Sequence, residues 1–156
     1  MDAFQQYCED WCVNNPMLSH VKGPESPNER FFFTFGYMGM TDALRGLTPE
    51  QSPCLQMDIN VSDRTTRGVQ YKDYTLYFCV RPSEQGDARQ ANEAIKECIQ
   101  LKNDFILDIE KLHKAHPVVG LIDTEGVQGS SMGPFFDGWM CWEMMIEVPE
   151  AKNICR

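Results

Sequence analysis

The sequence predicts an α+β fold: a mostly antiparallel sheet with one long helix packed on one face. Several short segments alternate hydrophobic and polar residues, which is typical of strands with one buried face. One stretch among them, residues 88–115, has apolar residues every three or four positions, as an amphipathic helix does. Runs of strands divided by one helix give the expected order α-β-β-β-α-β-β, with the helices on one side of the sheet.

The first elements are a helix, a loop and a strand. Residues 2–13 carry apolar side chains at three- and four-residue steps, and this spacing predicts a short amphipathic helix. A segment rich in Pro, Gly and Ser follows over residues 19–29 and predicts a loop. The aromatic run FFFTFGYM, residues 31–38, predicts the first strand.

Two further strands are expected over residues 55–61 and 74–80, where the alternation is nearly ideal. A polar segment that contains Gly68 joins them. This arrangement predicts a long hairpin with Arg64 and Arg67 near its tip.

The long helix is bounded by Asp87, which forms a capping-box pattern with Gln90, and by Pro117. At 1.5 Å per residue it is about 42 Å long, enough to cover a small sheet. Its buried stripe is expected to comprise Ala91, Ile95, Cys98, Ile99, Phe105, Ile106, Ile109 and Leu112. The strand residues expected to face it are Leu55, Met57, Ile59, Tyr74, Leu76 and Phe78.

Two strands are expected to complete the sheet, over residues 118–127 and 139–148, separated by the Gly- and Ser-rich turn QGSSMGPFFDG. The sequence contains no internal repeat, low-complexity segment or composition shift. We therefore expect a single domain over residues 1–156.

Composition disfavours several function classes. The net charge of -9 argues against holding nucleic acid through its phosphates, and no apolar run is long enough for a membrane helix or resembles a signal peptide. The number of cysteines is seven, which is odd, and no CxxC pair occurs, so we expect reduced thiols without a disulfide framework or a zinc ribbon. Cys8 and Cys12 lie one helical turn apart but lack further ligands at metal-site spacing.

No catalytic, cofactor-binding or metal-binding residue is predicted. His113 and His116 lie near the end of the long helix, where histidine interacts favourably with the helix dipole, and this explains them better than a metal site does. His20 lies in the Pro-rich loop, where a mobile catalytic base is conceivable. No GxSxG, P-loop or GxGxxG motif occurs, and the glycine-rich segment 126–133 is expected to be a turn.

The charge distribution and the aromatic residues point to contacts between subunits. The acidic excess lies in the termini and the last hairpin, whereas the central strands are balanced and carry arginines near a turn. A solvated surface explains this, and so does a head-to-tail contact in which the hairpin of one copy meets an acidic surface of the next. The candidate interface residues are Arg64, Arg67, Phe135, Phe136 and Trp139.

The order of elements and the closing segment LIDTEGV…DGWMCWEMMIEVPEAKNIC resemble the small proteins of phage necks and tails, the tail-terminator and head–tail connector group. The resemblance covers nearly the whole chain and implies a non-enzymatic virion subunit that is assembled in the host cytoplasm. It also implies a ring of six or twelve copies between portal and tail, contacts with neighbouring neck and tail proteins, and no cofactor. An acidic chain suits a pore through which DNA passes without being gripped.

Two alternatives stay open. One is a small cytosolic ligand-binding or regulatory domain, in which the polar face of the sheet forms a pocket. The other is a cysteine- or histidine-dependent enzyme, because seven cysteines and three histidines allow many pairings.

Overall fold

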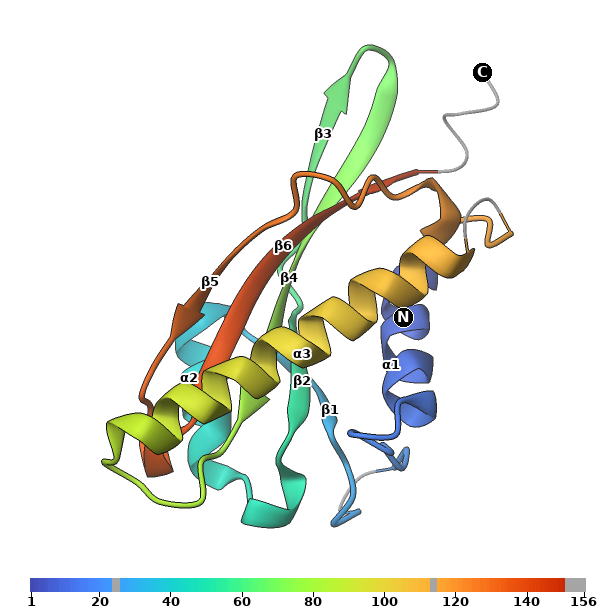
Figure 1. Ribbon diagram of the computed structural model, residues 1–156. Coiled ribbons are helices and arrows are strands. Elements are labelled where there is room, and N and C mark those ends of the chain that lie inside the picture. Colours follow the sequence, from blue (N-terminus) through green and yellow to red (C-terminus); the bar gives the residue numbers. More distant parts are fainter. Residues whose placement is uncertain (24–25, 113–114, 151–156) are drawn as a thin grey trace.

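A computed structural model describes residues 1–23, 26–112 and 115–150. Within these residues the chain forms three α-helices and a six-stranded, mostly antiparallel sheet, which confirms the predicted α+β class (Figure 1). The helices are α1 (Ala3–Asn14), α2 (Gly36–Gly46) and α3 (Ala88–Leu112). The strands are β1 (Phe31–Thr34), β2 (Cys54–Asp58), β3 (Ser62–Thr66), β4 (Val69–Val80), β5 (Gln128–Met132) and β6 (Met140–Pro149).

Strand β4 is the centre of the sheet. The strand order is β1-β2-β4-β6-β5, and β3 pairs with the part of β4 that extends beyond β2. Only β1 and β2 are parallel among the described pairs. The expected long hairpin is confirmed, although it is interrupted between β2 and β3, where the Asp58 carboxylate accepts the Asn60 N–H at 2.8 Å.

The helices α1 and α3 cover one face of the sheet, and the main core lies beneath them (Figure 1). Most of the predicted strand face is confirmed there, but Ile59 lies outside β2 and is 41% exposed. The fully buried positions of α3 are Ala94, Cys98, Leu101, Phe105 and Ile109. Most of the predicted stripe is therefore confirmed, since Ala91, Ile95, Ile106 and Leu112 also pack against this core. Ala94 and Leu101 were missed, and Ile99 is only half-buried because it lies at the margin of the stripe.

Two side-chain hydrogen bonds tie α1 to this face. The Tyr74 hydroxyl of β4 donates to the Asp2 carboxylate at 2.6 Å, and Asp2 also forms a capping box with Gln5 at the start of α1. The Trp11 indole N–H donates to the Asp108 carboxylate of α3 at 2.8 Å. These bonds fix α1 against β4 and α3 at both ends.

The start of α3 differs in detail from the predicted capping box. The Asp87 carboxylate accepts the N–H of Arg89 at 2.8 Å, so it caps the helix as expected. The Gln90 side chain instead accepts the Ser83 hydroxyl at 2.9 Å, which draws the preceding loop onto the first turn.

The opposite face of the sheet is covered by α2, which the sequence analysis missed (Figure 1). The strand expected over residues 31–38 ends at Thr34, and the expectation that all helices lie on one side is wrong. The chain leaves the strand because the Asp58 carboxylate accepts the N–H of Gly36 at 3.1 Å and Gly36 adopts a φ of +69°. Met40 and Leu44, one turn apart, then pack on the sheet.

The last two strands are also shifted. Residues 118–127 form a short 3-10 turn (Val119–Leu121) and a loop, whereas residues 128–132, expected in a turn, form the edge strand β5. Pairing with β6 overrides the weak strand preference of Gly and Ser. Gly129 is required there because any Cβ would lie 2.7 Å from the Glu143 carbonyl oxygen and collide with the Trp142 indole. The expected strand at 139–148 is confirmed as β6.

Among the described helices, none combines the length and the apolar character needed to cross a membrane.

Candidate functional site

The tip of the β3–β4 hairpin extends past the body of the sheet (Figure 1). Its two turn residues, Arg67 and Gly68, have φ values of +52° and +78°, and a two-residue turn with positive φ at both positions matches the right-handed twist of the strands. The Arg67 side chain is exposed and makes no hydrogen bond or ion pair with any described residue. It therefore presents an unpaired positive charge at the most outlying part of the sheet.

Arg64 is bound within its own chain. Its guanidinium forms an ion pair with Glu147 of β6, lies 3.9 Å from the Asp73 carboxylate and covers the Tyr71 ring at 4.8 Å. The sequence analysis placed both arginines near the tip, but Arg64 lies within β3, opposite Tyr71. Of the two predicted interface arginines, only Arg67 is available to a partner without breaking contacts in its own chain.

The two predicted phenylalanines lie beside α2. Phe136 is 42% exposed, and the Arg45 guanidinium lies 3.9 Å from the centre of its ring. Phe135 is half-buried, and its ring meets that of Tyr37 edge-on at 6.0 Å. Together with three exposed residues at the start of α2 they make up the α2 patch: Phe35, Tyr37, Met38, Phe135 and Phe136.

The margin of the α2 patch carries a charge of each sign: the Arg45 guanidinium lies over Phe136, and Asp42 lies beside Met38. Met38 is 68% exposed, and Asp42 follows it one helical turn later, also exposed and without a hydrogen bond or ion pair to a described residue. Residues four apart on a helix lie on the same side. The patch thus places an unpaired carboxylate next to exposed apolar surface.

Trp139 does not belong to this surface. Its side chain has no exposed area and packs in the second core with Met40, Leu44 and Tyr77. We therefore remove Trp139 from the candidate interface, because its buried side chain has no surface that a partner could contact. Its composition-based assignment failed because an interior tryptophan and an interface tryptophan look alike in sequence.

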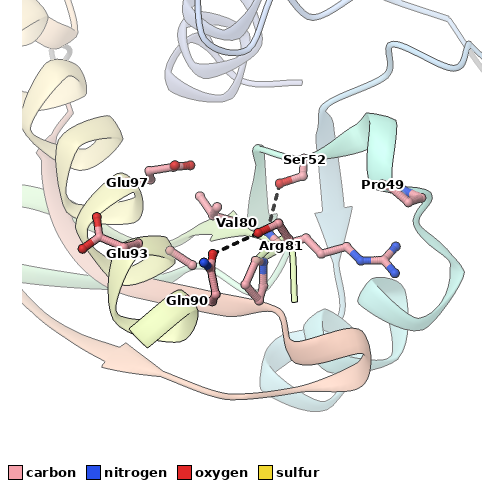
Figure 2. Close-up of a pocket in the computed structure, with 10 residues that line it drawn as sticks. Pro49, Ser52, Val80, Arg81, Gln90, Glu93 and Glu97 are labelled. Atoms are coloured by element: carbon pink, nitrogen blue, oxygen red, sulfur yellow. Dashed lines mark hydrogen bonds between the residues drawn. The ribbon is translucent and has the colours of Figure 1, made fainter. Parts of the chain in front are cut away.

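An open cavity of about 460 Å³ lies between the first turns of α3 and the end of β4 (Figure 2). Ser52 accepts the Arg81 N–H at 2.9 Å at its wall. Figure 2 shows the Arg81 guanidinium pointing toward Pro49, whereas the carboxylates of Glu93 and Glu97 lie on the opposite side. Charged groups that point apart do not form a catalytic constellation around one reacting atom.

The histidines are held in structural roles. His20 is 4% exposed, and its Nδ1 accepts the Arg30 N–H at 2.8 Å. Burial lowers the pKa of His20, and the nearby Glu9 carboxylate raises it by a smaller amount. The Nδ1 of His116 accepts the N–H groups of Val118 and Val119. His113 lies outside the described residues.

The cysteines are buried rather than activated. The six described cysteine side chains are free thiols in the interior, and Cys155 lies outside the described residues. Burial raises the pKa values of Cys8, Cys12 and Cys79, whereas a nucleophilic cysteine needs a lowered one. None of the hydrogen bonds made by the described thiols involves a histidine. No group of metal-ligating side chains suited to an ion occurs among the described residues.

Comparison with known proteins yields no match, whether to a protein-family model, to a curated protein or to a solved structure. The functional argument therefore depends on the surfaces and contacts of this chain alone.

Proposed function

We propose that the chain is a non-enzymatic structural subunit that assembles head to tail into a ring in the neck or tail of a phage, between portal and tail. One observation carries the proposal: the hairpin tip and the α2 patch are two different unsatisfied surfaces on separate parts of one subunit (Figure 1). A head-to-tail contact needs two unlike surfaces, and it closes into a ring when the rotation between copies divides a full turn.

In the proposed contact, the hairpin tip of one copy lies on the α2 patch of the next. Arg67 then meets the Asp42 carboxylate, while the exposed Phe35 and Met38 are covered. An exposed ion pair contributes only about 0.2–1 kcal/mol, so the charges set orientation and the apolar burial supplies most of the affinity.

The acidic composition is compatible with this role. With a net charge of -9, the subunit has a field that disfavours tight contact with DNA phosphates. Such a field suits the wall of a ring through which DNA moves.

A charge exchange tests the contact. Arg67→Glu places like charges at the proposed junction and is expected to shift the assembly toward smaller species, as measured by light scattering after size-exclusion chromatography. Arg67→Glu combined with Asp42→Arg restores opposite charges and is expected to restore the assembly. Arg64 is unsuitable for this test because its replacement also breaks the ion pairs with Glu147 and Asp73.

Lys96→Glu is the matched control. It changes the net charge by the same amount on the exposed side of α3, where the ion pair of Lys96 within the described part of the chain is with Glu93. The proposed contact is wrong if Arg67→Glu assembles like the unchanged chain, or if Lys96→Glu disrupts assembly equally.

The ligand-binding alternative has one observation in its favour, the open cavity beside Arg81. Under that alternative the chain stays monomeric or dimeric at micromolar concentration, and Glu97→Ala changes the binding of small molecules without changing size. The enzyme alternative predicts one thiol that reacts with a maleimide far faster than the others at neutral pH. The burial of the six described cysteines disfavours it.

A further inference from the structure

Three cysteines lie side by side beneath α2, on the adjacent strands β2, β4 and β6. Cys54 is directly opposite Cys79, and Cys79 is directly opposite Cys141. None of the three side chains has exposed area, and all belong to the second core. The Sγ atoms of Cys79 and Cys141 are 2.9 Å apart, and Met40 Sδ lies 3.9 Å from Cys141 Sγ.

The main-chain hydrogen bonds show which kind of pair Cys79 and Cys141 form. The Glu150 N–H donates to the Gln70 carbonyl oxygen at 2.8 Å, which makes these two opposite residues a hydrogen-bonded pair. Hydrogen-bonded and non-hydrogen-bonded pairs alternate along an antiparallel ladder, and the register continues without a break to Val80 and Met140. Cys79 lies an odd number of positions from Gln70, so Cys79 and Cys141 form a non-hydrogen-bonded pair.

Pairs of this kind have the backbone spacing that a disulfide needs. Their Cα atoms are about 4.5 Å apart, within the range of about 4.4–6.8 Å seen across disulfides. Cys98, another buried cysteine, lies in the main core instead, where its thiol contacts the Met140 carbonyl oxygen at 3.4 Å. Cys54 also lies directly opposite Cys79, so the distance of 2.9 Å between the Sγ atoms of Cys79 and Cys141 is what singles out this pair among the described cysteines.

We propose that Cys79 and Cys141 are an oxidation site that closes to a disulfide when the folded chain meets a hydroperoxide. One thiol releases its proton, the thiolate attacks an oxygen of hydrogen peroxide, the O–O bond breaks, and the proton joins the departing hydroxide, so a sulfenic acid and water result. The second thiol then releases its proton, its thiolate attacks that sulfur, the S–O bond breaks, and the leaving hydroxide takes the proton and departs as a second water. In total two thiols lose two electrons and two protons, and hydrogen peroxide is reduced to two waters.

The cover over this pair is helix α2, which packs Met40 and Leu44 on the sheet. Helix α2 contains Gly36, Gly39 and Gly46, and Phe35 at its start supplies no side-chain hydrogen bond. Glycine lowers helix stability by about 0.5–1 kcal/mol per interior position relative to alanine. Local opening of α2 therefore admits the oxidant, and oxidation is slow because the thiols are buried while α2 is closed.

Tryptic mapping of the full folded chain tests the proposal. The chain is treated with hydrogen peroxide, the peroxide is removed, the chain is denatured in excess N-ethylmaleimide so that remaining thiols are blocked as they become exposed, and the peptides are analysed without reductant. Cleavage after Lys and Arg, except at Arg81 before Pro82, isolates Cys79 in peptide 73–89 and Cys141 in peptide 115–152. The expected result is a cross-link between these two peptides and the loss of two free thiols per chain.

Two variants sharpen the result. Cys98→Ala removes a buried thiol from the opposite face and is expected to keep the cross-link, whereas Cys141→Ala is expected to abolish it. If Cys141→Ala fails to fold, as judged by circular dichroism, the peptide maps of the unchanged chain and of Cys98→Ala decide alone. The proposal is overturned if peptide 73–89 is linked to peptide 46–64, which carries Cys54, or if oxygen adds to single thiols without a cross-link.

Discussion

The two faces of the sheet carry cores of different size and composition. Beneath α1 and α3 lies an aromatic core, in which the Phe105 ring meets those of Trp11, Phe78 and Tyr7 at centroid distances of 5.1, 5.8 and 6.0 Å. Beneath α2 lies a smaller core rich in cysteine, with two helix residues, Met40 and Leu44, packed on it. We therefore expect α2 to separate from the sheet by local opening more readily than α1 and α3 do.

The largest effect is expected from Phe105→Ala on the first face. The side chain is fully buried, and its removal leaves a cavity between α1, α3 and β4. A loss of about 3–5 kcal/mol in the free energy of unfolding is expected, measured by urea denaturation. Leu107→Ala, at an exposed position of α3, is the control and is expected to change it by less than about 0.5 kcal/mol.

A smaller effect is expected from Leu44→Ala on the second face. Leu44 is fully buried, so a loss of about 2 kcal/mol is expected, the low end of the range for this change. The loss is limited because it cannot exceed the free energy of opening α2 alone. Hydrogen exchange is expected to accelerate in α2 and to stay unchanged in the centre of α3. Equal acceleration in both helices contradicts the proposed difference between the two faces.

The edge of the sheet offers a third comparison. Gly129→Ala forces a Cβ against Trp142 and the Glu143 carbonyl, and a loss of about 1–2 kcal/mol is expected from overpacking. Gly46→Ala has open space around the added atom and is expected to be neutral or slightly stabilising. Urea denaturation of both variants measures the contrast. If both substitutions are neutral, the close approach of Trp142 to β5 is wrong.

The smallest effect is a pH dependence on the first face. Burial lowers the pKa of His20, so the unfolded chain, with a histidine pKa near 6.5, binds more protons than the folded one. The free energy of unfolding therefore does not depend on His20 well above pH 6.5. It decreases as the pH falls below 6.5 toward the lowered pKa of His20 in the folded chain. His20→Asn keeps an acceptor for the Arg30 N–H but does not titrate, so its stability is expected to fall less between pH 7.5 and 5. An identical pH dependence in both proteins refutes the assignment.

The first face was predictable because its signals are periodic. Leu55 and Met57 alternate with polar residues, and the apolar stripe of α3 recurs with helical spacing, so class and main core followed. The second face was not predicted, since α2 has three glycines, which favour helices least after proline, and only two of its side chains are buried. The aromatic run that precedes α2 also has a strong strand preference, so the sequence predicted a strand that continued past Thr34.

Tertiary contacts decided the remaining differences. β5 is a strand because β6 pairs with it, although Gly and Ser favour turns. Arg64 looked available in the sequence, yet Glu147 lies far along the chain and meets it across the sheet. The exposed Phe35 and Met38 were hidden in an expected strand, so the patch beside Phe135 and Phe136 appeared only when α2 was placed.

The central claim is that one copy uses its hairpin tip and the next its α2 patch, which makes assembly the most direct test. Multi-angle light scattering and electron microscopy of the purified full chain measure copy number and shape over a range of micromolar concentrations. The account predicts a closed ring of six or twelve copies that Arg67→Glu disrupts and Arg67→Glu with Asp42→Arg restores. A chain that stays monomeric throughout, or a two-fold dimer joined through identical surfaces, contradicts it.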